Sequence, residues 1–427
     1  MANKETKLSK NKDEETAIFK FFSHGINTAK DEWLVNISEQ NLYQRITFFI
    51  DIYNNSQDFE NRIKWSRNLK IRHNKNCKEI FNYNNIKPFC YRPFSPNFIY
   101  FSEILIDERG YRKQLGKENL TIAISGQSSN KFFHCLVSDK LIDLHCTGDS
   151  QCLPLYRYEK GERIDNITDW GLEQFREYYH NVKRASSPSE DNRQDACFTD
   201  KESQYKIKKE NIFYYVYGVL HNPKYRQKYE LNLKREFPRI PFYDDFWQWV
   251  KWGKQLMDLH LNYETIKPYE LKRIDVDKSP PELGAGGQIH APKSPTLGTS
   301  KPSLTPPELG VGGRFPELGA RERLSVKPKL RADKINHQII IDEVTTLTEI
   351  PPLAWEYKLG NRSALEWILD QYKEKKPKDK TIAEKFNNYR FADYKEEVID
   401  LLMKVTTVSM ETMKIINEMN NFGAKKI

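Results

Sequence analysis

Hydrophobic and polar positions follow different patterns along the chain, which begins with an almost entirely polar segment. Residues 1–16 carry too few apolar groups to offset the entropy lost on folding, so they are predicted to be disordered. Short apolar runs on either side of Gly25 then predict two strands, the second through residues 33–35. Apolar residues at helical spacing over 41–53 predict a helix.

Short runs of β-branched and aromatic residues continue up to residue 203. They are bounded by Gly, Ser, Asn and Asp, and predict antiparallel strands at 98–105, 120–126, 131–138, 140–146 and 153–159. The turn SGQSSNK at 125–131 is small, flexible and rich in hydrogen-bonding side chains. It is either an ordinary solvated turn or a loop that fits a nucleic-acid groove.

From about residue 204 the apolar spacing becomes helical. Asn222 before Pro223 is typical of an N-cap followed by a favoured first-turn residue, and predicts a helix that ends before Pro238. The apolar stripe of this helix comprises Tyr225, Tyr229, Leu233 and Phe237. Its opposite side carries Lys224, Lys228 and Arg235. Those three cations suit phosphate contacts, with a solvated basic face as the alternative.

Helical spacing then continues over 242–261. The predicted core residues of this second helix are Phe246, Trp249, Leu256 and Leu259. Pro, Gly and Ser dominate the next stretch, where SPPELGAGG, TPPELGVGG and FPELGA form an internal repeat. Such a composition predicts a disordered insertion or linker, and no lysine or preceding strand makes it a phosphate-binding loop.

Compact sequence resumes near residue 332, with strands predicted at 337–342 and 354–360 and helices at 363–375 and 394–419. The fold class is therefore α+β: an antiparallel, strand-rich N-terminal half, a helical region and a C-terminal strand-helix segment. The predicted parts are a tail at 1–16, a strand-rich part at 17–203, a helical part at 204–275, the repeat insertion at 276–331 and a C-terminal part at 332–427.

Composition narrows the classes of protein. The 427 residues include 68 Lys and Arg against 59 Asp and Glu, a net charge of +9 that mildly favours polyanionic partners. Aromatic residues make up 13% of the chain, as expected of a folded protein. No apolar run approaches the ~18 residues needed to cross a bilayer, and no signal peptide is apparent, so a cytoplasmic protein without membrane contact is expected.

Candidate catalytic chemistry is sparse. The six cysteines form no CxxC pattern, and the spacing within His134, Cys135, His145, Cys146 and Cys152 matches no usual zinc site, so buried free thiols are expected and no metal or other cofactor is predicted. Asp342 followed by Glu356 and Lys358 imitates the acid, then acid-x-Lys pattern of metal-dependent nucleases. Short patterns of this kind also arise by chance in a charged chain. Walker A, NPPY-like and Gly-x-Ser-x-Gly motifs are absent from the sequence.

Eight segments, in order, carry a resemblance to a known family. They are GINTAKDEWLVNIS from Gly25, CYRPFSPNFIYF from Cys90, CLPLYRY from Cys152, ENIFYYVYGVLHNPKYRQKY from Glu210, FPRIPF from Phe237, LHLNYE from Leu259, WEYKLGNRSALEWILDQY from Trp355 and VTTVSMETMKII from Val405. Together they resemble the C-terminal target-recognition (specificity) region of type ISP restriction-modification enzymes. The resemblance covers nearly the whole chain apart from the tail and the repeats.

The resemblance implies that the chain reads an asymmetric duplex DNA sequence. In such enzymes an adjoining methyltransferase modifies adenine and a helicase-like motor translocates DNA toward nuclease cleavage. This chain lacks the motifs of all three activities, so it is expected to be non-catalytic on its own. A separate motor and methyltransferase polypeptide is a candidate partner.

Readout by this family implies base contacts from polar loop residues and phosphate contacts from cations. The candidate DNA contacts are Lys30, Gln127, Lys131, Lys224, Lys228, Arg235, Asn361 and Arg362. For Asn361 and Arg362 the alternative is a structural turn after Gly360. A second set, Thr28, Asp31 and Trp33, resembles a family segment near the methyltransferase and is assigned to an interdomain junction.

Two further functions remain open from the sequence. One is a metal-dependent DNA nuclease that uses Asp342, Glu356 and Lys358. The other is an inert remnant of a disrupted restriction-modification gene, which the inserted repeats slightly favour.

Overall fold

A computed structural model describes residues 1–55, 62–107, 118–126, 132–186, 207–276 and 326–422. Within these residues the chain has helices and mainly antiparallel sheets, which confirms the α+β fold class. Residues 127–131 of the predicted turn and residues 277–325 of the predicted insertion lie outside the described residues. Over the described part of the chain, no helix combines the length and apolar character of a membrane span.

The first sixteen residues differ from the predicted disordered tail. They form helix α1 (Lys4–Leu8) and a turn of 3-10 helix, η1 (Lys12–Glu14). Asn3 caps α1 by accepting a hydrogen bond from the Thr6 amide at 2.7 Å, and Lys7 donates to the Phe22 carbonyl at 2.6 Å. Hydrogen bonds within the segment and to Phe22 therefore hold residues 1–16 in place, although the segment has little apolar surface to bury.

The N-terminal part joins helices to a small sheet. Its helices are α2 (Asp31–Leu34), α3 (Glu39–Asn55) and α4 (Arg67–Asn74), followed by η2 (Tyr83–Asn85). The sheet has the order β2 (Val35–Asn36), β4 (Ser95–Tyr100), β3 (Ile86–Arg92) and β7 (Leu141–Ile142), with β3 and β7 parallel. The strand predicted at 33–35 is wrong at its start, because Trp33 and Leu34 end α2 and point into the core.

The central sheet has the order β1 (Ser23–His24), β8 (Gln151–Pro154), β5 (Thr121–Ile124) and β6 (Cys135–Ser138), next to the hairpin β9 (Tyr156–Glu159) and β10 (Glu162–Asp165). Its core packs against α5 (Asp169–Ser186), α6 (Lys209–His221) and α9 (Phe246–Leu261). Helices α6 and α9 approach closely at two glycines. A Cβ on Gly253 would lie 1.8 Å from the Tyr214 carbonyl oxygen, so only glycine fits there.

The helix predicted from Asn222 to Phe237 is interrupted. Asn222 caps α7 (Pro223–Lys228) as predicted, accepting from the Lys224 amide at 2.9 Å. Helix α7 ends with its C-cap at Tyr229, and the chain then forms the short helix α8 (Glu230–Leu233). The break fits a tertiary contact: the Tyr225 hydroxyl donates to the Arg239 carbonyl, so the segment after α8 packs back against α7.

The C-terminal part has a sheet in the order β11 (Lys272–Asp275), β14 (Thr345–Thr348), β13 (Gln338–Asp342) and β12 (Pro328–Asp333). The repeat stretch therefore connects two strands of one sheet, so it interrupts a single folded unit. The remaining elements are η5 (Pro352–Trp355), β15 (Lys358–Leu359), β16 (Arg362–Ser363), α10 (Ala364–Gln371), α11 (Lys380–Lys385), η6 (Phe391–Tyr394) and α12 (Lys395–Asn421).

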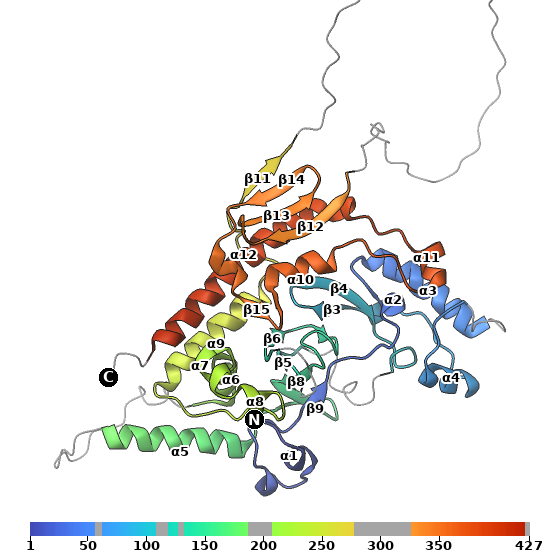
Figure 1. Ribbon diagram of the computed structural model, residues 1–427. Coiled ribbons are helices and arrows are strands. Elements are labelled where there is room, and N and C mark those ends of the chain that lie inside the picture. Colours follow the sequence, from blue (N-terminus) through green and yellow to red (C-terminus); the bar gives the residue numbers. More distant parts are fainter. Residues whose placement is uncertain (56–61, 108–117, 127–131, 187–206, 277–325, 423–427) are drawn as a thin grey trace, which may run out of the picture.

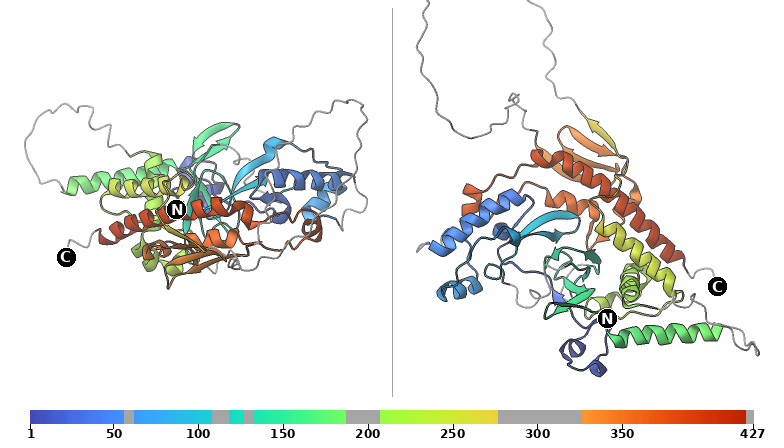
Figure 2. Two further views of the ribbon diagram at one scale, coloured as in Figure 1. Left: turned by 90° about the horizontal axis from the view of Figure 1, so that it is seen from above. Right: turned by 180° about the vertical axis from the view of Figure 1, so that it is seen from behind.

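Helix α12 ties the parts together. It runs beside α9 in both the front and back views (Figures 1 and 2). Its first half packs in the C-terminal core, whereas Ile415 and Met419 belong to the core of the central sheet. His260 of α9 contacts Thr412 of α12 at 3.0 Å between Nε2 and Oγ1. The result is one framework in which the N-terminal sheet faces α10 (Figure 1).

Candidate functional site

A groove of about 460 Å³ lies between the N-terminal sheet and α10. From the N-terminal part it is lined by Asp31, Glu32, Asn36, Tyr91, Arg92, Ser95 and Asn97, and from the C-terminal part by Arg362, Trp367, Asp370, Gln371, Lys373, Lys375 and Tyr389. Two of the residues selected from sequence, Asp31 and Arg362, thus meet in one site although they lie near opposite ends of the chain.

The N-terminal wall is held by a hydrogen-bonded network. The Asp31 carboxylate accepts from the Thr28 hydroxyl and, at 3.0 Å, from the Tyr91 hydroxyl. Burial raises the pKa of Tyr91, so the phenol stays protonated and remains a donor. Arg92 stacks over the Tyr91 ring at 3.9 Å and donates to Asp143 at 2.6 Å. Asp31 and Arg92 are therefore rigid parts of the wall.

Helix α2 also fixes the segment that follows α10. The Glu32 carboxylate accepts hydrogen bonds from the Lys378 and Asp379 amides, each at 2.9 Å. The Trp33 indole donates to the Asp379 carboxylate at 2.8 Å. Thr28 and Trp33 are fully buried, so neither side chain reaches the surface, and Trp33 joins α2 to the segment before α11.

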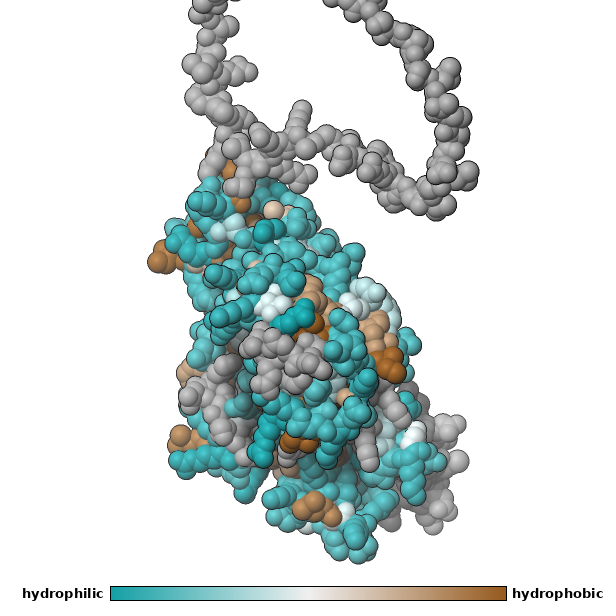
Figure 3. Space-filling model, turned by 90° about the vertical axis from the view of Figure 1, so that its right-hand side faces the viewer, coloured by the Kyte–Doolittle hydropathy of each residue, from teal (hydrophilic) through white to brown (hydrophobic). Residues whose placement is uncertain are grey.

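The segment fixed in this way is strongly basic. From the end of α10 to the first residue of α11 it carries five exposed lysines, which we call the basic loop: Lys373, Lys375, Lys376, Lys378 and Lys380. The two carboxylates of this segment accept hydrogen bonds from within the protein. Glu374 accepts from the Phe391 amide at 2.8 Å, and Asp379 caps α11 and accepts from the Trp33 indole. The side of the molecule seen in Figure 3 is largely hydrophilic with only scattered hydrophobic residues. Because the five lysines of the basic loop are exposed, positive charge beside the groove faces solvent.

Arg362, the predicted contact, lies in this groove together with Asp370. Its guanidinium is 3.0 Å from the Asp370 carboxylate and lies over the Trp367 ring at 5.1 Å. Partial burial disfavours the charged carboxylate, but the nearby Lys375 and Arg362 hold the pKa of Asp370 below its usual value. Asn361 is exposed in the turn after Gly360, whose φ of 70° suits glycine.

Lys30 does not fit the role predicted from the sequence. Its side chain is buried, with Nζ 3.2 Å from the Ser66 hydroxyl and 3.5 Å from the Asp107 carboxylate. Burial lowers the pKa of Lys30 to about 8. The ammonium group is thus part of the interior and is not accessible to DNA.

The other predicted cations lie outside the groove. Lys224 and Lys228 are exposed on α7, and Arg235 is exposed after the end of α8, so the three do not share one helix face. Figure 1 places α7 and α8 beside the central sheet, apart from α10. Gln127 and Lys131 lie outside the described residues.

The nuclease candidates are not assembled as a metal site. Asp342 is buried, accepts from the Val344 and Thr345 amides, and pairs with Lys395 at 2.7 Å. Glu356 and Lys358 are exposed near η5 and β15. Among the residues that the structure describes, no group of three or more His, Cys, Asp or Glu could hold a metal ion. Asp342 therefore stabilises the turn between β13 and β14.

The expectation of buried free thiols is confirmed for the central cysteines. Cys135, Cys146 and Cys152 are buried, and no disulfide joins them within the described part of the chain. Cys135 contacts the His221 ring at 3.6 Å, and burial raises its pKa to about 11, which suits a protonated core thiol.

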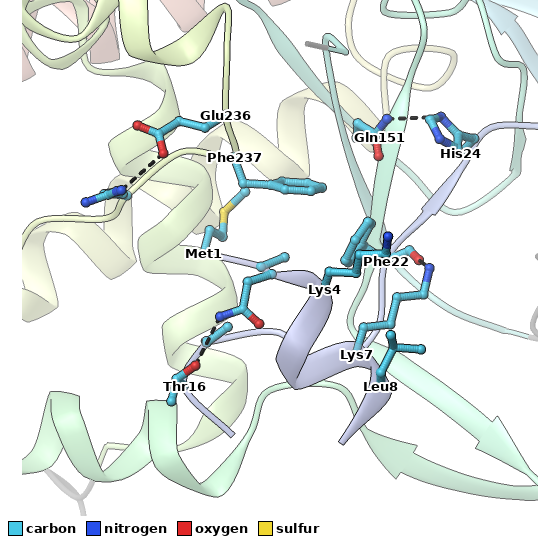
Figure 4. A pocket seen from close by; sticks show the side chains of 14 residues that line it. Met1, Lys4, Lys7, Leu8, Thr16, Phe22, His24, Gln151, Glu236 and Phe237 are labelled. Carbon is cyan, nitrogen blue, oxygen red and sulfur yellow. Dashed lines mark hydrogen bonds and ion pairs between the residues drawn. The ribbon is translucent and has the colours of Figure 1, made fainter. Parts of the chain in front are cut away.

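A larger cavity, of about 1000 Å³, lies between the N-terminal segment and the chain after α8 (Figure 4). Many of its polar groups are paired with one another. Gln151 contacts His24 at 3.0 Å, Asn3 donates to Thr16 at 3.1 Å, and Arg239 pairs with Glu236 at 3.1 Å. The groove is the better candidate site because the five exposed lysines of the basic loop lie beside it.

Sequence reasoning missed most of the groove. Asn36, Asn97 and Gln371 are scattered polar residues without a motif, and only the fold brings them together. The basic loop did have a signal, since five lysines occur within KEKKPKDK at 373–380.

Comparison with known proteins agrees with the resemblance noted from sequence. The profile of the type ISP C-terminal specificity domain matches residues 17–401. The solved structure described as a cryoEM DrdV–DNA complex is similar with a TM-score of 0.78 and 38% identity, over 98% of this chain and 37% of that one. No curated protein matches.

Two further solved structures are similar. A nuclease-deletion mutant of the type ISP restriction-modification enzyme LlaGI, in complex with a DNA substrate mimic, has a TM-score of 0.66 and 27% identity over 94% of this chain and 33% of its own. The ATP-dependent type ISP enzyme LlaBIII bound to DNA has a TM-score of 0.67 and 24% identity over 94% and 23%, which shows the fold alone. The chain therefore spans between about a quarter and two fifths of the length of these three proteins.

Proposed function

This chain belongs to the type ISP C-terminal specificity domain family, and from that premise we propose that it recognises a duplex DNA sequence through the groove between the N-terminal sheet and α10. The observation that carries the proposal is the basic loop beside a groove lined by polar side chains. Exposed cations suit the phosphate backbone, whereas amides and Arg362 suit base edges.

The groove offers the amide of Asn36 for base readout, beside a buried amide that supports the wall. Asn97 is buried and donates to the Ser95 carbonyl and hydroxyl, both at 3.1 Å, so it fixes the wall of the groove. Asn36 accepts from the Ser38 amide at 2.9 Å through its side-chain oxygen, which leaves its NH₂ group as a donor. Side chains held in place in this way lose little entropy on binding.

Further contacts are proposed outside the groove. Lys224, Lys228 and Arg235 are exposed and would add phosphate contacts if the duplex extends past α7. Asn361 is adjacent to Arg362 and would extend the readout. Gln127 and Lys131 remain predictions.

Catalysis is assigned elsewhere in this proposal. The DNA-bound relatives are much longer than this chain, and a separate motor and methyltransferase polypeptide stays the candidate partner to which the chain would supply recognition. We assign Asp31 to the groove wall, whereas a junction with a methyltransferase would have to use exposed residues around it.

A lysine-replacement experiment tests the groove. Lys373, Lys375, Lys376 and Lys378 are changed together to Ala, and binding of a fluorescent 30-base-pair random duplex is followed by anisotropy at several KCl concentrations. Each lost phosphate contact lowers the magnitude of the log–log salt slope by ~0.9. We expect the slope to fall by about 3.6 for four lost contacts and affinity at low salt to fall roughly 100-fold.

The control replaces four lysines of α9 and α12, namely Lys251, Lys254, Lys404 and Lys414. It removes the same total charge from a different surface. If both variants lose affinity equally, the binding is non-specific attraction to net charge, and the groove is not the DNA site. No binding by the unaltered chain at low salt would also contradict the proposal.

A further inference from the structure

One carboxylate oxygen in the groove holds three donors that could otherwise face DNA. Asp370 Oδ2 lies 3.0 Å from Arg362 Nη1, 3.4 Å from Lys375 Nζ and 3.4 Å from Gln371 Nε2. All four residues line the groove. The carboxylate thus occupies the position, relative to these donors, that a phosphate oxygen or a base acceptor would take.

We propose that Asp370 is a specificity-determining residue, which holds Arg362, Lys375 and Gln371 in the free protein and repels the backbone of DNA that lacks the target sequence. The inference rests on the proposed function of the groove. Discrimination between two ligands often needs a repulsive element against the wrong one as well as contacts to the right one. A random duplex must displace the carboxylate for phosphate contacts alone, whereas a target duplex adds base contacts that offset this cost.

The position of Asp370 supports a role other than stabilising its helix. It lies in the last turn of α10, where the helix dipole disfavours a negative charge. The neighbouring cations keep the carboxylate ionised in spite of its partial burial. A residue that the helix itself disfavours is held there by groove residues.

The other charged groups of the N-terminal wall already have partners outside the set of donors. Asp31 accepts from Thr28 and Tyr91, Glu32 accepts from two backbone amides, and Arg92 pairs with Asp143. Among the carboxylates that line the described groove, Asp370 is the one that pairs with groove cations. Neutralising Asp370 would therefore release Arg362 and Lys375 and leave the hydrogen bonds of the N-terminal wall intact.

The arrangement of Arg362 shows what the carboxylate restrains. The guanidinium lies over the Trp367 ring, and the Trp367 indole donates to the Leu359 carbonyl at 2.9 Å, which fixes the ring. Arg362 can keep this stacking while its outer edge exchanges Asp370 for a guanine or a phosphate. Asp370 thus sets when Arg362 becomes available and need not contact DNA.

The test is Asp370→Asn, which keeps the size of the side chain and removes the charge. We expect a random 30-base-pair duplex to bind about 5- to 10-fold more tightly at 100 mM KCl, with a log–log salt slope steeper by about 1 to 2 because Arg362 and Lys375 become free for phosphates. A duplex enriched from a random library by the unaltered chain should gain less, so the ratio of target to random affinity falls.

Asp400→Asn is the matched control, because Asp400 pairs with Lys404 at 2.6 Å on α12, outside the groove lining. It removes the same charge and should leave the ratio unchanged. Thermal unfolding of both variants verifies that the fold is retained. Asp370→Glu, which keeps the charge, should retain weak binding of the random duplex if charge is the cause.

The outcomes separate the inference from the proposed function. If the basic-loop variant loses binding while Asp370→Asn has unaltered affinity and salt slope, the groove binds DNA and the role of Asp370 is wrong. Weaker binding of both duplexes by Asp370→Asn would also overturn it, because the carboxylate would then be a base contact. If neither the basic loop nor Asp370 affects DNA binding, the proposed function itself fails.

Discussion

Two stretches of this chain combine aromatic and basic residues, one in the packed core and the other beside the groove. The stretch 211–242 is the more conspicuous in sequence, yet Tyr215, Tyr217 and Tyr225 are buried and bind the framework through their hydroxyls. The stretch 359–380 has fewer aromatic residues, but it lines a groove and carries the basic loop. Aromatic density indicates packing, whereas function depends on which cations the fold leaves exposed.

The chemistry of the two stretches differs in the same way. Around Tyr217 a buried network joins its hydroxyl to His260 Nδ1 at 2.6 Å, and His260 Nε2 to Thr412 at 3.0 Å. Burial lowers the pKa of His260 to about 3, so the ring is neutral in the fold. In the groove, by contrast, charged groups face one another and solvent. The first stretch should govern stability and the second DNA binding.

The largest expected effect on stability comes from Gly253→Ala. The new Cβ would lie 1.8 Å from the Tyr214 carbonyl oxygen, so α6 and α9 would have to separate. We expect destabilisation by about 3 kcal/mol or more, at or above the upper range for overpacking. Lys254→Ala, at an exposed neighbour on α9, should be nearly neutral. Denaturant unfolding of the two variants measures this, and equal midpoints would contradict the close packing of α6 on α9.

The next effect is acid destabilisation through the two buried histidines. Burial lowers the pKa of His260 to about 3, and burial with the nearby Arg226 lowers the pKa of His221 well below its usual value. The unfolded chain binds these protons below pH ~6.5 while the folded chain does not, so the stability present above pH 6.5 is lost as the pH falls toward 3. Each histidine contributes up to ~1.4 kcal/mol per pH unit in that window.

Denaturant unfolding at pH 7.5, 6.5 and 5.5 gives the slope. Between pH 6.5 and 5.5 the free energy of unfolding should fall by about 2 kcal/mol from the two rings, because the unfolded histidines are only half protonated at pH 6.5. His180→Ala, at an exposed residue of α5, should keep the same slope. A stability that does not change over this range would mean that the rings take up protons in the folded state.

Periodicity predicted the elements whose burial follows from local pattern. The helices over 41–53 and 242–261 and the central strands are confirmed because their apolar residues face one core. It failed at Trp33 and Leu34, which are apolar residues at the end of a one-turn helix, and at Tyr229, where a tertiary hydrogen bond ends α7. Local spacing cannot show where tertiary packing interrupts an element.

The groove could be predicted only in part. Arg362 was found through the family resemblance, and the lysine run of the basic loop was visible in the sequence. Lys30 was misassigned because sequence cannot show that its ammonium group is turned inward to Asp107. Asn36 and Gln371 lie far apart in sequence, and their meeting depends on the packing of α10 against the N-terminal sheet.

The smallest expected effect tests whether the basic loop must be held in place or needs only its charge. Glu32 holds the loop by accepting from the Lys378 and Asp379 amides. Glu32→Asp keeps the charge but is one methylene shorter, so it cannot reach both amides without movement. We expect a stability loss of about 1 kcal/mol, the usual contribution of one such hydrogen bond. Affinity for duplex DNA should fall by roughly threefold, because ~0.6 kcal/mol of the binding free energy would be lost in reordering the loop.

The matched control is Glu384→Asp on α11, an exposed residue whose shortening should change neither quantity. Because both substitutions leave the net charge unaltered, a difference between them reports on the position of the lysines and not on their number. Equal DNA affinities, together with the expected loss of stability in Glu32→Asp, would mean that the basic loop attracts DNA without being aligned by α2. Glu32 would then stabilise the fold without affecting DNA binding. The stretches 211–242 and 359–380 would differ, for DNA binding, only in how much positive charge they expose.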